Sequence, residues 1–205
     1  MKKILLVLLI FSISFWSCND DVEQVDDENK LTENEKNVES TEVENKQKPE
    51  LNIEFKAFLT QFKAVSLPYE LNPEQEDVFG KISVENQIKY LAKAEDLEKA
   101  DFEEMAEYTD FFFVSRPVQS KEFNAVVYAR FEMGSTYYFL CTFDNDGKLI
   151  ANIDFAAYEL IGAGPQAGRE YNTKAKIETD LKVMVITDEE TLSYLIKENG
   201  SIDKL

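Results

Sequence analysis

The chain has 205 residues, and its 40 Asp and Glu against 22 Lys and Arg give a formal charge of −18. Such an acidic chain repels phosphate backbones, so we expect no nucleic-acid partner. It contains no histidine, which excludes a Ser-His-Asp triad, a Cys-His pair and a His-ligated metal. We therefore expect no metal, no cofactor and no catalytic residue.

The first segment has the pattern of a secretory signal peptide. Lys2 and Lys3 precede an apolar run of 13 residues, from Ile4 to Trp16. A helix needs about 20 apolar residues to cross a bilayer, so this run is too short to span the membrane stably. The run ends on Ser17 and Cys18.

Segment 17–21, Ser-Cys-Asn-Asp-Asp, resembles the cleavage region of bacterial lipoproteins, in which the cysteine is lipidated. Phe15 and Trp16 are bulkier than the usual residues of that motif, but lipoproteins of the Bacteroidota kind tolerate a looser motif. The acidic residues after Cys18 are similar to a surface-export signal of that group. The resemblance covers about 28 residues. It implies a signal peptide over 1–17, a membrane anchor at Cys18, and a location in the cell envelope, favouring the outer membrane; the alternative is an ordinary signal peptide.

Residues 18–50 have the composition of a disordered tether. Between residues 19 and 50 there are 12 acidic residues, four basic residues and no aromatic residue. Low hydrophobicity with high net charge favours disorder. A flexible chain of this length spans about 30 Å, so it serves either as a stalk that holds the domain off the membrane or as a simple spacer.

Residues 51–205 suit one globular domain with a net charge of −12. Its first part has helical periodicity. Apolar residues predict a helix over 51–62, and a second helix over 84–94 has Ser83 as a plausible N-cap. Residues 95–107 are helix or loop.

After residue 107 the apolar period changes to two, which predicts strands. These cover residues 108–114, 123–131, 137–143 and 149–155, with Pro117 marking an edge or a bulge and an Asp-Gly hairpin at 144–147. A second sheet section follows over 173–177 and 181–187, and residues 188–197 have the spacing of a short helix. We therefore predict an α+β fold: a twisted antiparallel β-meander of five to six strands, with N-terminal helices on one face and a short C-terminal helix.

Three residues are candidates for binding: Gly164, Arg169 and Tyr138. Loop 162–168 holds three of the seven glycines and leads into Arg169, but it lacks the Lys-Ser/Thr pair of a phosphate-binding loop. It is either a mobile connection or a loop whose Arg169 contacts an anionic group. Tyr138 belongs to a set of strand aromatics in which neighbours must point to opposite faces. One face packs on helices, and the other is either covered too or an exposed binding surface.

Other reactive groups fit structural roles better. Cys141 alternates in phase with Tyr137 and Phe139, so we expect it to be buried, and no histidine could activate its thiol. The sequence Asp-Asn-Asp-Gly at 144–147 does not meet the ligand spacing of a calcium loop. Carboxylate pairs are the catalytic chemistry that remains open, as in glycoside hydrolysis. Acidic residues of this kind are Glu103, Glu104, Glu107, Asp110, Asp154 and Glu159.

These observations predict a lipid-anchored envelope lipoprotein with a small, non-catalytic binding domain. Its partner could be another envelope protein, and the acidic domain favours a basic one through electrostatic steering. The alternative is a small-molecule-binding or carboxylate-dependent hydrolytic domain, whose mark would be a pocket that holds two carboxylates. A purely structural spacer is the third interpretation.

Overall fold

The computed structural model describes residues 51–75 and 80–205. The predicted signal peptide at 1–17, the lipidated Cys18 and the tether over 18–50 lie outside these residues. Within the described ranges, no helix is both long and apolar enough to cross a membrane.

Short helices form within both N-terminal segments that the sequence predicts as helical, although their bounds differ. Helix α1 (Ile53–Leu59) begins at Asn52, whose side chain accepts hydrogen bonds from the backbone N–H groups of Glu54 and Phe55. Helix α2 (Val84–Asn86) continues through a π-helical segment, η1 (Gln87–Leu91), into α3 (Ala92–Glu95), and Ser83 caps it as predicted. Helix α4 (Lys99–Met105) lies within residues 95–107, for which the sequence predicts either a helix or a loop. Helix α1 is shorter than the predicted segment 51–62.

The described residues form a sheet of ten strands in the order β1-β3-β4-β5-β6-β7-β8-β9-β10, with β2 paired to β7. Strand β1 is parallel to β3, and the other neighbours are antiparallel. The strands are β1 (Lys63–Ala64), β2 (Tyr69–Leu71), β3 (Thr109–Gln119), β4 (Asn124–Glu132), β5 (Ser135–Phe143), β6 (Leu149–Leu160), β7 (Glu170–Ile177), β8 (Lys182–Ile186), β9 (Thr191–Ile196) and β10 (Ile202–Lys204).

The α+β class and the antiparallel meander are therefore confirmed, but the predicted number of five to six strands is wrong. The predicted C-terminal helix over 188–197 is also wrong, because β9 occupies that segment. Leu192, Tyr194 and Ile196 alternate along β9 and face one apolar core. Leu192, Leu195 and Ile196 also fit helical spacing, and this coincidence gave the helix prediction.

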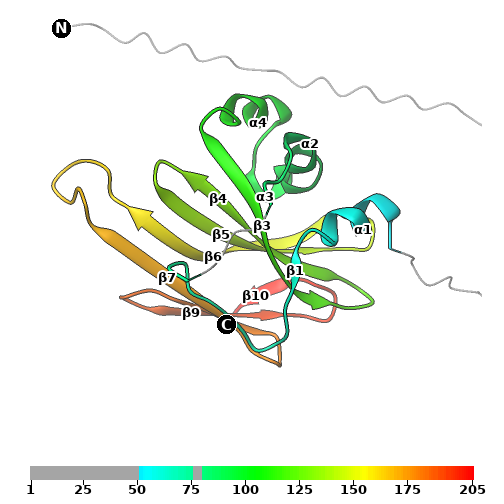
Figure 1. The fold of residues 1–205 in the computed structure, drawn as a ribbon. Coiled ribbons are helices and arrows are strands. Elements are labelled where there is room, and N and C mark those ends of the chain that lie inside the picture. Colours follow the sequence, from blue (N-terminus) through cyan, green and yellow to red (C-terminus); the bar gives the residue numbers. More distant parts are fainter. Residues whose placement is uncertain (1–50, 76–79) are drawn as a thin grey trace, which may run out of the picture. The chain divides into compact units, whose positions relative to one another are not determined.

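Two apolar cores cover the two faces of β3–β6. Figure 1 shows the helices on one side of these strands and β9 and β10 on the other. The helix-side core contains Phe55, Phe58, Tyr90, Phe102, Phe111, Phe113, Tyr128 and Cys141. The opposite core joins the meander to β2 and β7–β9, and contains Val127, Tyr138, Leu140, Phe155, Ile177 and Val185. Both faces of the sheet are thus covered, so the strand aromatics on the second face pack in a core instead of forming an exposed surface. Tyr137 contacts the first core and Tyr138 belongs to the second, as strand alternation requires.

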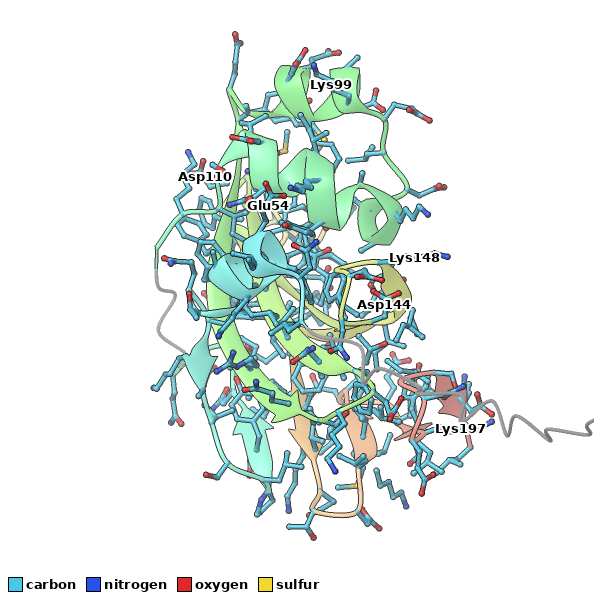
Figure 2. The ribbon with its side chains drawn as sticks, turned by 90° about the vertical axis from the view of Figure 1, so that its right-hand side faces the viewer. Glu54, Lys99, Asp110, Asp144, Lys148 and Lys197 are labelled. Atoms are coloured by element: carbon cyan, nitrogen blue, oxygen red, sulfur yellow. The ribbon has the colours of Figure 1, made fainter. Side chains whose placement is uncertain are left out.

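The β5–β6 hairpin turn packs beside α1. Asp144 accepts hydrogen bonds from the backbone N–H groups of Asp146 and Lys148, at 3.0 and 2.9 Å, so turn chemistry explains this acidic sequence. The backbone N–H of Asn52 donates to the carbonyl of Asn145 at 2.9 Å and joins the turn to the start of α1. Figure 2 labels Glu54 on α1 and Asp144 in this turn.

Candidate ligand-binding cavity

A cavity of about 640 Å³ opens where β7 leaves β6. The β6–β7 ladder covers only Ala157–Leu160 and Glu170–Thr173, after which β7 pairs with β2 and β8. The β5–β6 register shifts just before this point, between the pairs Tyr138–Ala156 and Phe139–Asp154, so Phe155 is an extra residue. A bulge increases the local twist of a strand, which is consistent with the separation of the two sheet sections here. We call this site the β6–β7 cavity.

The walls of the β6–β7 cavity are rich in aromatic and aliphatic side chains. They come from β5, β6, β8 and β9, and comprise Tyr137, Tyr138, Phe139, Ile153, Phe155, Ala156, Ala157, Val185, Leu192 and Tyr194. Apolar walls with a few placed polar groups are typical of small-ligand sites, and the volume lies within their usual range of about 300–1,000 Å³.

Five polar side chains complete the lining: Arg130, Asp154, Glu159, Thr173 and Thr187. Asp154 is exposed and Glu159 is partly exposed. Within the described part of the chain, no ion pair or hydrogen bond engages either carboxylate. The two carboxylates are therefore available to a ligand.

Arg130 lies between the cavity and the helix-side core. Its Nη1 is paired with the carboxylate of Glu95, whose side chain is only 1 % exposed, and its Nε lies 3.5 Å from Oε2 of Glu132. The guanidinium also lies over the rings of Tyr137 and Phe139, at 5.4 and 5.2 Å from their centroids. These contacts fix the guanidinium, and the two carboxylates balance its charge.

Glu95 is held at the end of α3 by its surroundings. Asp96 ends α3 in a left-handed conformation with φ of 54°, and Asn152 on β6 donates a hydrogen bond to the carbonyl of Ala94 at 3.1 Å. The hydroxyl of Tyr128 donates to Glu95 Oε1 at 2.5 Å. The buried carboxylate thus has two donors, as buried charges require.

Burial also controls two acidic groups beside this pair. It raises the pKa of the Tyr128 hydroxyl well above its usual range, and Cys141 and Glu95 add to the shift. Burial likewise raises the pKa of the Cys141 thiol, with a further contribution from Glu95. Cys141 is fully buried as predicted and stays a neutral thiol. It has the environment of a structural cysteine rather than a nucleophile.

The three candidate binding residues lie in two places. Tyr138 is 3 % exposed and lines the β6–β7 cavity. Gly164 and Arg169 are exposed in the β6–β7 loop and do not line the cavity. The loop is closed by its own backbone: Ile161 N–H donates to the carbonyl of Arg169, and Gly168 N–H donates to that of Ile161, at 3.0 and 2.7 Å.

Among the acidic candidates, only Asp154 and Glu159 line the β6–β7 cavity. Glu103 pairs instead with Lys99, and Asp110 pairs with Lys81. Over residues 51–75 and 80–205, no three acidic or cysteine side chains gather in a way that could hold a metal ion.

Sequence reasoning missed the Glu95–Arg130 pair, although β4 carries a signal for it. Val126 and Tyr128 alternate on the helix-side face, and Arg130 is the next residue in phase. A charge at a core-facing position requires a buried partner, and the preceding acidic helical stretch contains one.

No protein-family model, curated protein or solved structure matches this chain. The function must therefore be inferred from the sequence and from the geometry of the cavity.

Proposed function

We propose that this chain is a lipid-anchored protein of the cell envelope whose domain binds a small organic ligand in the β6–β7 cavity. The observation that carries the proposal is the cavity itself, with about 640 Å³ of space, apolar walls and two unengaged carboxylates. The sequence of the first 21 residues supports the envelope location. In this reading the domain is a binding module, and the anchor keeps it at a membrane.

The site is built to keep its shape. Tyr138 and Phe155 belong to the core that joins the two sheet sections, and Arg130 is fixed by Glu95. Side chains fixed before a ligand arrives lose little conformational entropy on binding, which favours affinity.

Carboxylate-dependent hydrolysis is less well supported than binding. Asp154 and Glu159 are four ladder positions apart on β6, because Phe155 is bulged, and this separates their Cα atoms by about 13 Å. Glycosidases place their two carboxyl groups about 5–9.5 Å apart. With the Cα atoms this far apart, the two carboxyl groups come within that range only where both side chains bend toward each other. The pair therefore suits recognition of the two ends of a ligand better than joint attack on one bond.

A protein-interaction surface is a second candidate, favoured by one cluster of exposed apolar side chains. Met133, in the β4–β5 turn, is 90 % exposed, and Leu160 lies against the same turn near Gly134. The other exposed apolar residues at this end of the sheet are Tyr108, Phe131 and Tyr171. Crosslinking on intact envelopes with the native chain and Met133→Glu would test this surface. Recovery of one stoichiometric partner by the native chain alone would support it.

A thermal-unfolding screen tests the cavity proposal. The protein, purified in detergent, is heated with amines, amino acids, sugars and carboxylates, since a ligand that binds the folded state raises Tm. Thr173→Phe places a ring in the cavity and should abolish the shift. Thr179→Phe, in an exposed turn outside the cavity, is the matched control and should keep it. An equal shift in native protein and Thr173→Phe would contradict binding in the cavity.

A further inference from the structure

The charges and the spacing along β6 narrow the class of ligand; this inference rests on the proposed binding function. Arg130 is the one basic residue among the described lining residues, and Glu95 and Glu132 already balance its charge. Asp154 and Glu159 have no such counter-charge. The cavity therefore presents net negative charge, which favours a cation and disfavours carboxylate, phosphate or sulfate ligands.

One small apolar side chain separates the two carboxylates. Because Phe155 is bulged, Asp154, Ala157 and Glu159 share one face of β6, whereas Ala156 faces the opposite core with Tyr138. The order along the strand is therefore charge, apolar floor, charge. A ligand that contacts both carboxylates must span on the order of 10 Å.

The facing walls suit an alkyl-ammonium chain. Tyr137 and Phe139 line the cavity and pair with Ala157 and Asp154 in the β5–β6 ladder, so their rings share the face of the carboxylates and can pack against methylene groups. The hydroxyls of Thr173 and Thr187 can accept hydrogen bonds from ammonium N–H groups.

We propose that the β6–β7 cavity binds a linear aliphatic polyamine, with one ammonium group at Asp154, another at Glu159, and the chain between them over Ala157 and its ladder partner Thr173. A diamine with a short chain reaches one carboxylate only. A monoamine likewise gains one of the two ionic contacts. Affinity should therefore rise from monoamine to short diamine to triamine.

Titration calorimetry at physiological salt tests this proposal, with spermidine, putrescine and butylamine as probes. Spermidine should bind the detergent-purified protein with one-to-one stoichiometry and more tightly than putrescine. Asp154→Asn and Glu159→Gln should each weaken spermidine binding roughly five- to tenfold, as loss of one partly exposed ionic contact would. Asp146→Asn and Glu104→Gln, both exposed and outside the cavity, are the matched controls and should leave affinity unchanged.

Other outcomes would overturn the proposal in distinguishable ways. Weak binding at several sites, lowered equally by all four variants, would show association with the acidic surface only. Absence of spermidine binding, together with a Thr173-dependent thermal shift from a neutral or anionic compound, would overturn the polyamine while leaving the cavity as a binding site. Absence of any cavity-dependent ligand in both experiments would contradict the binding function itself.

Discussion

Glu95 and Arg130 form an ion pair across the boundary between the helix-side core and the β6–β7 cavity. The Glu95 side chain is 1 % exposed and that of Arg130 is 22 % exposed, so this pair is better shielded from water than an ordinary surface ion pair. Arg130 reaches the cavity lining, whereas Glu95 and Tyr128 bind each other behind it. The buried carboxylate thus positions the one basic residue of the described lining.

Glu95→Gln should destabilise the domain by about 2–3 kcal/mol, because it leaves Arg130 without its buried counter-charge. Urea unfolding followed by circular dichroism measures the change. Glu103→Gln is the control, since Glu103 and Lys99 form an exposed pair on α4, and its cost should stay below about 0.5 kcal/mol. If both variants lost the same free energy of unfolding, burial would not strengthen the Glu95–Arg130 pair.

The buried thiol makes stability sensitive to alkaline pH. Because the folded pKa of Cys141 lies above its ordinary value of 9.0, the unfolded chain loses this proton first as the pH rises. The buried thiol therefore contributes its whole stabilisation below pH 9. Above pH 9 the free energy of unfolding falls by up to about 1.4 kcal/mol per pH unit because of this group. Tyr128 contributes in the same direction above its ordinary value of 10.0.

Urea unfolding at pH 8, 9 and 10 should therefore show a shallower decline in Cys141→Ala than in the native protein. Val126→Ala, in the same core, removes buried volume without removing a titratable group and should keep the native slope. Parallel slopes for all three proteins would contradict the linkage to Cys141.

The turn at Gly147 supports helix α1 through a close approach. Gly147 has φ of +83°, and a Cβ atom there would lie 2.8 Å from the ring of Phe55. Gly164 has nearly the same φ, +84°, but open space around it. Gly147→Ala should therefore cost more than Gly164→Ala, whose cost of about 1–2 kcal/mol reflects the left-handed backbone alone. Equal shifts in the urea midpoint would mean that α1 moves aside freely.

The proposed anchor makes a separate prediction about location. Each buried methylene contributes about 0.8 kcal/mol, so an acylated Cys18 should keep the protein in the membrane fraction after washing with high salt. Cys18→Ala should appear in the soluble fraction. If Cys18→Ala stays in the membrane fraction to the same extent, an acyl anchor at this residue is not what holds the protein there.

The sequence predicted those parts of the fold that local periodicity specifies. The four strands of the meander, the Asp-Gly hairpin and the Ser83 cap all follow from patterns within about ten residues. Strands β1, β2 and β10 have two or three residues each, too few to show a period. The apolar residues of β9 fit both the period of a helix and that of a strand, and pairing with β8 makes the segment a strand.

The cavity was harder to predict because its residues come from separate strands. Tyr138, Asp154 and Glu159 were recognised singly, but their common site depends on where β7 leaves β6. That departure coincides with a bulge at Phe155, and a bulge changes register without leaving a marker such as glycine or proline here. The loop at 162–168 had the clearer sequence signal, yet it lies outside the cavity lining.

Chemical-shift mapping by NMR during a spermidine titration would show directly whether the ligand binds in the β6–β7 cavity. At physiological salt we expect saturable amide shifts centred on Tyr137, Asp154, Ala157, Glu159 and Thr173. The amides of exposed acidic residues such as Glu104 and Asp146 should change little. Shifts spread over the acidic surface, with none concentrated at β6, would contradict a polyamine site in the β6–β7 cavity.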